Sequence, residues 1–224
     1  MGLLMRYNII NKLFFLVLVI SVPIIVLFTS IEILAYDMNY YKNQYHKYNI
    51  YENIGIDESS LMESTEKLLD YIKGKKADLD FIVKINGEEV EFFSNKDKLH
   101  MIDVKNLFNR GHFIRNALVL LILFVLLSLK FHKKLKLDIG KCLLTISIFG
   151  NIPLVLLLGA IIFDFNKYFT IFHEIFFGND LWLLDPNVDR LVNIFPESFF
   201  SDTVIKILLC YSIIQTVFLI IGII

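Results

Sequence analysis

Residues 13–35 read LFFLVLVISVPIIVLFTSIEILA, a run that is almost entirely apolar. A helix needs about 20 apolar residues to cross the hydrocarbon core of a bilayer. The run therefore predicts a membrane-spanning helix. The composition of the whole chain agrees, because its 224 residues are 56% hydrophobic and have a mean hydropathy of +0.61. Such a chain is too apolar for a water-soluble surface of ordinary size.

Three further apolar runs predict three more spanning helices, over residues 114–131, 142–163 and 204–224. One of these runs contains the polar residue Asn151. An isolated helix could not shelter this side chain from lipid, because a polar group in hydrocarbon needs a partner. We therefore expect the four helices to pack as a bundle.

The first run could instead be a secretory signal, because Arg6 and Lys12 precede it. Its apolar stretch is longer than the usual signal core of about 7–15 residues, and no pair of small residues marks a cleavage site after it. We interpret residues 1–36 as an uncleaved membrane anchor.

The short loop at residues 132–141 predicts the orientation of the chain. It contains four lysines and one aspartate, and short basic loops stay in the cytoplasm. Arg6 and Lys12 place the N-terminus on the same side. We therefore predict a multi-pass plasma-membrane protein with both termini in the cytoplasm and with residues 37–113 and 164–203 outside the cell.

The first outer segment predicts a small folded cap. Asp57 or Ser59 can cap a helix that ends at Gly74. The stretch DFIVKINGEEVEFF follows, and its Asn86-Gly87 pair is typical of a type I′ turn between two strands. The predicted fold class is an α-helical integral membrane protein, with a four-transmembrane-helix bundle and a small extracytoplasmic α/β cap.

The cap ends in KLHMIDVKNLFNRG, residues 98–111, which predicts a short amphipathic helix in the membrane interface. We expect its Asn-Arg-Gly end to close this helix before the second span. His100 and Asp103 are three residues apart, so they can share one helical face. His173 follows the third span on the same side of the membrane, so we expect the two histidines to meet.

The second outer loop is acidic and aromatic. It holds seven acids, two bases and Trp182, the only tryptophan of the chain. Structural roles are open to its acids: Asp180 can cap a turn, and Asp185, which precedes a proline, can begin a helix. Asp189 can pair with Arg190. Arg190 can instead bind a buried acid or a polar headgroup.

Several classes of function are disfavoured. A net charge of −1 gives no basic face for nucleic acid. Cys142 and Cys210 lie inside apolar runs, which argues against disulfides and against a thiol nucleophile. His173-Glu174 begins a zinc-protease pattern, but the second histidine would fall at Phe177. We predict no metal and no cofactor. The alternative is a metal site formed by His100, His173 and an aspartate.

The remaining residues suggest proton transfer at a lipid ester. A histidine changes its charge near neutral pH and suits general acid–base work. An imidazole oriented by a carboxylate, beside a wall formed by Phe172, Phe176, Phe177 and Trp182, can act on an ester at the membrane surface. The alternative is that these residues only anchor the chain, as the aromatic belts of membrane proteins do.

Two stretches resemble a known family. HMIDVKNLF before the second span and FHEIFFGNDLWLLDPNVDRLVNIFPESFFSD before the fourth are similar to the Lit family, the lipoprotein intramolecular transacylases of low-GC Gram-positive bacteria. The four-span layout is similar as well. The two essential histidines of the family match His100 and His173. The other positions that agree with the pattern are Asp103, Trp182, Asp185, Asp189 and Arg190.

The resemblance implies a substrate and an activity. The substrate would be a diacylated lipoprotein in the membrane, whose N-terminal cysteine carries a diacylglyceryl group and a free α-amine. The enzyme would be an acyltransferase that moves the sn-2 acyl chain onto this amine and leaves a lyso-form lipoprotein at the outer leaflet.

The residues suit this chemistry. Both reacting groups belong to one molecule, so no covalent acyl-enzyme is required. We expect His173 to act as base, with Glu174 or a loop aspartate nearby, and His100 to stabilise the carbonyl oxygen; the reverse assignment is the alternative. The alternative function is a non-enzymatic sensor or assembly factor that binds a partner through the cap. The sequence makes no prediction of the oligomeric state.

Overall fold

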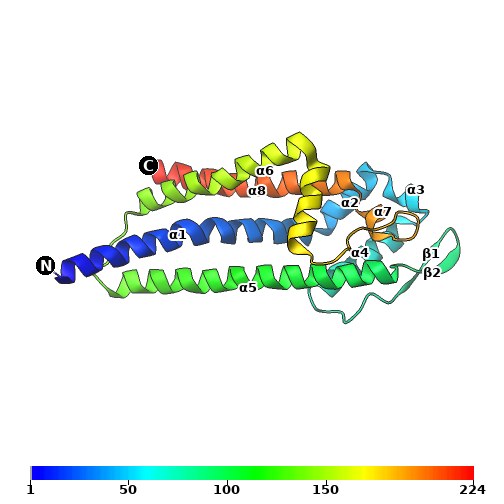
Figure 1. Cartoon of the computed structure of the whole chain (residues 1–224), viewed down its shortest axis with the longest axis horizontal. Helices are drawn as coiled ribbons and strands as arrows, with labels where there is room; N and C mark the ends of the chain where they lie inside the picture. Colours follow the sequence, from blue (N-terminus) through cyan, green and yellow to red (C-terminus); the bar gives the residue numbers. More distant parts are fainter. Residues whose placement is uncertain (1) are drawn as a thin grey trace. The chain divides into compact units, whose positions relative to one another are not determined.

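The computed structural model describes residues 2–224, without the side chains of residues 2–6 and 160. Met1, the first residue of the predicted anchor, therefore lies outside the described residues, as does the side chain of Arg6. The described chain is mostly helical and contains one two-stranded sheet (Figure 1). Its elements are α1 (Gly2–Ala35), α2 (Met38–Lys47), α3 (Ile50–Ile54), α4 (Glu58–Ile72), β1 (Ile82–Ile85), β2 (Glu88–Glu91), α5 (Asn95–Phe131), α6 (Ile139–Phe176), α7 (Leu191–Ile194) and α8 (Glu197–Ile223).

These elements form two compact units. The bundle unit consists of the residues up to Glu32 together with Gly111–Phe163 and Ile205–Ile224. The α/β unit consists of Ile33–Arg110 and Asp164–Val204. Both histidines that the sequence analysis selects belong to the α/β unit.

Four helices among the described residues are long and apolar enough to cross a membrane. They are α1 from Tyr7 onward, α5, α6 as far as Gly159, and α8, and their most apolar stretches have mean hydropathies between 2.1 and 2.8. This confirms the predicted fold class of a four-transmembrane-helix protein with a small α/β portion.

Apolar and polar contacts hold the bundle unit together. Phe14 of α1, Val125 of α5 and Ile146 of α6 belong to one buried apolar cluster. The hydroxyl of Ser147 on α6 donates a hydrogen bond to the backbone carbonyl of Gln215 on α8 at 2.8 Å. All four spanning helices are thus joined through contacts on α6.

Two polar groups of the spanning helices find partners within the protein. The amide Nδ2 of Asn151 donates to the carbonyl of Ser147, one turn earlier in α6, at 2.8 Å. Glu32 of α1 forms an ion pair with Arg115 of α5, and His112 of α5 contacts the same carboxylate. Because an unpaired charge is costly in a membrane, this group of Glu32, Arg115 and His112 holds α1 against α5. The sequence analysis did not identify it.

The helix α5 has no break at residues 109–111, so the predicted end of a short interfacial helix before the second span is wrong. The helix continues from Asn95 to Phe131. Gly111 is instead a position of close packing within the bundle unit. A Cβ built on it would lie 2.9 Å from a ring carbon of Phe28 on α1. The glycine therefore lets a neighbouring ring approach and does not end a helix.

The predicted helix and hairpin of the α/β unit are present. Asp57 caps α4, and its side chain accepts the N–H of Ser60 at 2.9 Å. Strands β1 and β2 pair antiparallel. Asn86 and Gly87 between them have φ angles of 51° and 88°, as both central residues of a type I′ turn require. The helices α2 and α3 were not predicted.

The core of the α/β unit is rich in aromatic residues and includes the first turns of α5, which carry His100. Tyr45 of α2 and Phe92 after β2 are completely buried, and Phe93 is almost so. Met101, next to His100 on α5, belongs to the same cluster, as does Ile194 of α7. Packing against these rings fixes the position of the first turns of α5.

One residue of α6 has a non-helical backbone. It is Asp164, with φ −168° and ψ 88°, and it follows the last residue of the predicted third span. Its side chain accepts the N–H of Lys167 at 3.1 Å, as a helix N-cap does. Residues 165–176 then form the C-terminal segment of α6, which carries His173 in the α/β unit.

The substitution Gly222→Ala is expected to destabilise the bundle unit. The added Cβ would lie 2.7 Å from the backbone nitrogen of Leu144 and 2.9 Å from the carbonyl oxygen of Gly140. Helices α6 and α8 would have to separate, and overpacking of this kind costs about 1–3 kcal/mol. The measurement is the midpoint of thermal unfolding in detergent. Gly159→Ala is the matched control, because nothing lies within 4 Å of its added Cβ. Equal midpoints for the two variants would contradict the close packing.

Candidate active site

His100 and His173 lie together in the α/β unit, as the sequence analysis expects. His100 is on α5 and His173 is on the C-terminal segment of α6. Their ring centroids are 6.2 Å apart and their planes are tilted by 34°. Both residues are buried, with 6% and 8% of their surface exposed. Two imidazoles from distant parts of the chain therefore share one protected position.

Aromatic rings surround the pair. Phe169 and Trp182 lie 4.2 and 4.9 Å from the ring of His173. The ring centroid of Phe177 lies 5.2 Å from that of His100, in an edge-to-face arrangement, and 5.5 Å from that of His173. Trp182 and Phe177 are therefore part of an apolar wall, as predicted, whereas Phe169 was not among the predicted members.

The other two predicted wall residues are more exposed than Phe177. Phe172 touches His173, with centroids 5.4 Å apart, whereas Phe176 contacts Phe172, with centroids 4.8 Å apart and planes tilted by 43°. Phe172, Ile175 and Phe176 are all exposed. The C-terminal segment of α6 thus buries His173 on one face and presents large apolar side chains on another.

A backbone carbonyl fixes the tautomer of His173. Its Nδ1 lies 2.7 Å from the carbonyl oxygen of Phe169, one helical turn earlier. A carbonyl oxygen only accepts hydrogen bonds, so Nδ1 carries the proton and donates it. In the neutral ring the lone pair is then on Nε2, which is the atom available to act as a base.

His100 has an unsatisfied ring nitrogen. Its Nδ1 is buried and has no hydrogen-bond partner among the residues that the structure describes. Buried polar atoms normally have a partner, and an exception at a candidate site points to a missing ligand or substrate. His100 therefore has capacity for one further hydrogen bond inside the protected position.

Burial keeps both imidazoles neutral at physiological pH. His100 belongs to the α/β unit, whose part of α5 ends at Arg110, and so lies outside the bundle unit. Burial lowers the pKa of His100 to about 4; the neighbouring His173 acts in the same direction and Asp103 opposes it. Burial also lowers the pKa of His173, against the opposing effect of its hydrogen bond to Phe169.

The expected carboxylate partner of the histidines is absent among the described side chains. Asp103 instead accepts a hydrogen bond from Nδ2 of Asn179 at 2.9 Å, and Asn179 accepts the N–H of Leu181 at 3.0 Å. Asp103 therefore braces the loop that leads to Trp182. Its effect on His100 is only electrostatic.

Glu174 and Asp180 also lie apart from the histidines. Both are exposed, and neither side chain forms a hydrogen bond or an ion pair with another described residue. Adjacent helical residues point in different directions, so the burial of His173 turns Glu174 outward. The orienting role expected of Glu174 is performed by the carbonyl of Phe169.

Asp185 and Asp189 have structural partners. Asp185 accepts hydrogen bonds from the backbone N–H and the side-chain Nδ2 of Asn187, both at 2.9 Å, which is an Asx turn. Asp189 is buried and accepts from the hydroxyl of Ser94 at 2.6 Å and from the N–H of Asp185 at 2.8 Å. The expected pair of Asp189 with Arg190 is not formed; Asp189 is used to hold the loop.

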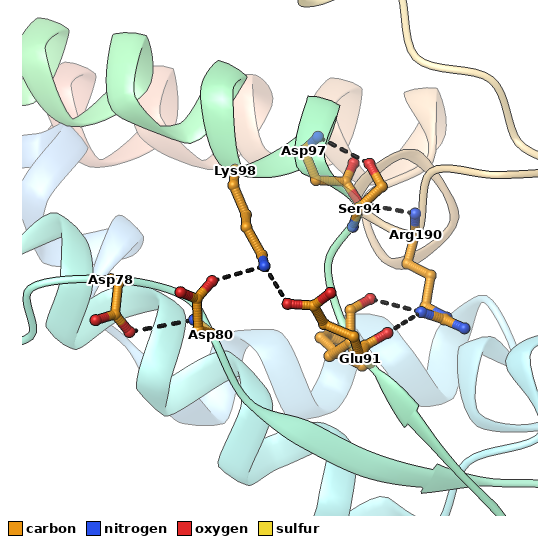
Figure 2. A network of polar contacts seen from close by, with 8 residues as sticks. Asp78, Asp80, Glu91, Ser94, Asp97, Lys98 and Arg190 are labelled. Carbon is orange, nitrogen blue, oxygen red and sulfur yellow. Dashed lines mark hydrogen bonds and ion pairs between the residues drawn. The ribbon is translucent and has the colours of Figure 1, made fainter.

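The side chain of Arg190 binds backbone carbonyls and not an acid. Its guanidinium donates to the carbonyl of Phe92 at 2.8 Å and to that of Glu91, and its backbone N–H donates to Asp97 at 3.0 Å (Figure 2). It thereby fastens the end of β2 to the loop that precedes α7.

Asp97 is the central residue of this network, and the sequence analysis missed it. Completely buried, it accepts the backbone N–H groups of Ser94 at 3.1 Å, of Arg190 at 3.0 Å and of Leu191 at 3.3 Å. The hydroxyl of Ser94 accepts the N–H of Asp97 at 3.0 Å in return (Figure 2). This is a capping box, and the signal was readable as Ser94-x-x-Asp97 at the start of a helix.

Over residues 2–224 there is no group of three or more histidine, cysteine, aspartate or glutamate residues that could hold a metal ion. The two imidazoles of the candidate site have aromatic and backbone neighbours in place of further ligands.

The chain is similar to known proteins in sequence pattern and in fold. The family model described as lipoprotein intramolecular transacylase Lit matches residues 16–200. The membrane-integral lipoprotein intramolecular transacylase Lit from Bacillus cereus has a similar fold, with a TM-score of 0.78 and 22% identity over 94% of this chain and 93% of that chain. Two variants of that protein, with one histidine replaced by arginine or by alanine, also match with TM-scores of 0.78 and 22% identity, each over 97% of this chain and over 92% and 94% of theirs. No curated protein matches the chain.

Acidification is expected to destabilise the wild type more than His100→Gln. A group whose pKa is lowered on folding binds fewer protons in the folded state, so the free energy of unfolding falls as the pH drops from 6.5 toward about 4. At about pH 5, the titration of His100 is expected to lower the free energy of unfolding of the wild type by about 2 kcal/mol relative to neutral pH. Thermal unfolding in detergent at about pH 7 and about pH 5 measures it. Equal losses in the two proteins would contradict a neutral, buried His100.

The substitution Asp97→Asn is expected to lower the free energy of unfolding by about 1–3 kcal/mol. Asparagine keeps the shape, but in either orientation its NH₂ group meets a backbone N–H that needs an acceptor. Asp80→Asn is the matched control, because this carboxylate is 67% exposed in its ion pair with Lys98 and such pairs contribute little. Comparable denaturant midpoints for the two variants would show that the buried network does not stabilise the unit.

Proposed function

Because the chain belongs to the lipoprotein intramolecular transacylase (Lit) family, we propose that it moves the sn-2 acyl chain of a diacylglyceryl lipoprotein onto the α-amine of that lipoprotein's own N-terminal cysteine. The observation that carries the proposal is the buried pair of imidazoles, with centroids 6.2 Å apart and one tautomer set by the backbone. A non-enzymatic role would leave this arrangement without a purpose.

His173 is the proposed base. Its Nε2 lone pair is free because Nδ1 is committed to the carbonyl of Phe169. The amine of the substrate must lose a proton as it attacks the ester carbonyl, and a neutral imidazole within hydrogen-bond reach can take that proton. Since burial lowers the pKa of His173, the ring is in its neutral, proton-accepting form at pH 7.

His100 is the proposed hydrogen-bond donor to the ester carbonyl. Charge develops on this oxygen when the amine adds to the carbonyl carbon, and one preorganised donor can contribute about 3 kcal/mol. The ring has a spare nitrogen without a partner among the described residues. A neutral imidazole is a competent donor, because one of its nitrogens always carries a proton.

The two histidines account for every bond and proton of the proposed acyl transfer. The amine nitrogen forms a bond to the carbonyl carbon, and the bond from that carbon to the sn-2 oxygen breaks. The proton that His173 takes from the amine is returned to the departing glyceryl oxygen. The products are an N-acyl cysteine and a free hydroxyl group on the lipid, and both histidines regain their starting state.

The intramolecular substrate explains the simplicity of the site. Well-oriented groups of one molecule can react as if present at about 10⁵ M or more. A serine or cysteine nucleophile is then unnecessary, and the two cysteines are distant from this role because they lie in the spanning helices. The enzyme has to orient two groups and to move one proton.

The exposed apolar residues support a position at the membrane surface. Phe172, Ile175 and Phe176 lie near His173 on the C-terminal segment of α6, and their exposed side chains are suited to contact acyl chains. The basic loop 132–141 favours the cytoplasm. We therefore place the histidine pair at the outer leaflet, where a lipoprotein ester resides.

The substitutions His100→Ala and His173→Ala are expected to lower acyl transfer by at least about 100-fold each, the usual effect of removing a positioned acid–base group or oxyanion donor. Purified protein is incubated with a diacylglyceryl lipopeptide, and mass spectrometry locates the acyl chain on nitrogen or on the glyceryl oxygen. Glu174→Ala is the matched control, because this neighbour of His173 is exposed; it should keep wild-type activity.

Wild-type rates in both histidine variants would contradict the mechanism. Transfer by neither the wild type nor any variant would favour the non-enzymatic alternative. Release of free fatty acid in place of an N-acyl product would identify a hydrolase.

A further inference from the structure

The α/β unit contains an open groove of about 590 Å³ that the proposed reaction does not use. It lies between Asn53 of α3, Ile85 at the end of β1, and residues 186–198. Its volume falls within the range of about 300–1,000 Å³ that is typical of ligand sites. The lining mixes apolar side chains with amides, so it differs from the aromatic surroundings of the histidines.

The polar residues of the groove have hydrogen-bonding capacity to spare. Asn53, Asn187 and Asn193 each donate their NH₂ group to a neighbouring protein oxygen, at 3.3, 2.9 and 2.7 Å. None of their Oδ1 atoms has a partner among the described residues. The guanidinium of Arg190 donates through one nitrogen to two carbonyls, and its other guanidinium N–H groups have no partner in the described part of the chain.

This pattern fits the main chain of a peptide. A peptide presents N–H donors and carbonyl acceptors at regular intervals, and the groove offers fixed amide oxygens for the former and guanidinium N–H groups for the latter. Val188, Ile85 and Ile54 provide apolar contact between these groups. An acyl chain would leave the amides and the guanidinium unused, so lipid is the poorer occupant.

The groove is within reach of the histidine pair. Trp182 touches His173, and Pro186, four residues later, lines the groove. Four residues span at most about 14 Å between their Cα atoms. An extended peptide that advances about 3.3 Å per residue covers this distance in about four or five residues.

We propose that this groove binds the polypeptide segment that follows the lipidated cysteine, beginning about four residues after it. The inference rests on the proposed acyl transfer and adds to it a peptide subsite. Its consequence is that substrate recognition depends on the length of the peptide and not only on the lipid.

The experiment compares two substrates with the same diacylglyceryl cysteine. One ends at the cysteine as an amide, and the other carries about eight further uncharged polar residues, enough to fill the groove beyond the four or five needed to reach it. We expect kcat/KM of the wild type to be about tenfold higher for the long substrate, the worth of one or two peptide hydrogen bonds. A substrate with two extra residues should behave as the short one.

The variant Val188→Trp tests the groove itself. Val188 is 66% exposed and lines the groove, so a tryptophan there obstructs it without removing a contact of the folded chain. The ratio of kcat/KM for long over short substrate is expected to fall to about one, mainly through KM. Ile82→Trp is the matched control, because Ile82 is 65% exposed on β1 and does not line this groove. It should keep the wild-type ratio.

Asn53→Ala provides a second variant, which removes one unpaired amide oxygen. It is expected to lower the ratio by a few-fold. Equal kcat/KM values of the wild type for the long and short substrates would overturn the peptide subsite while leaving the proposed function intact. An unchanged ratio in Val188→Trp would also overturn it. Failure of the wild type to transfer acyl chains on either substrate would instead refute the proposed function, and the subsite with it.

Discussion

The α/β unit depends on one buried carboxylate. Asp97 accepts backbone N–H groups from Ser94, at the start of α5, and from Arg190 and Leu191, at the start of α7. A buried carboxylate is stable only when hydrogen bonds replace its lost hydration, so the two chain segments must meet wherever Asp97 is buried. This requirement holds the helix that carries His100 against the segment that follows Trp182, whose ring contacts His173.

Both imidazoles of the pair are neutral. A carboxylate beside His173 would favour its charged form and raise its pKa, whereas the carbonyl of Phe169 orients the ring without adding a net charge. Rings at 4.2 and 4.9 Å exclude water and favour the neutral state further. Such a site suits a reaction whose two partners already belong to one molecule, because the enzyme needs a neutral base and a donor but no strong nucleophile.

The bundle unit is stabilised by different interactions from those of the α/β unit. Lipid offers no hydrogen-bond partner to a polar group. Asn151 therefore donates a hydrogen bond within its own helix, and the carboxylate of Glu32 pairs with Arg115 and contacts His112. Glycines at close approaches, such as Gly111 beside Phe28 and Gly222 beside the backbone of Leu144, let these helices pack where larger residues would separate them. The bundle thus relies on small residues and paired charges, while the α/β unit relies on aromatic rings.

The four spans, the helix that Asp57 caps and the hairpin at Asn86-Gly87 follow from the sequence alone, because hydropathy, capping and turn chemistry act over a few neighbouring residues. The sequence also predicts that His100 and His173 meet, and the structure places their ring centroids 6.2 Å apart. Only the tertiary structure decides that Asp189 and Arg190 brace a loop and that a backbone carbonyl orients His173. The hydrogen-bond partner of a buried polar group often comes from a distant segment of the chain. Local sequence patterns do not identify that segment, because only folding brings the two together.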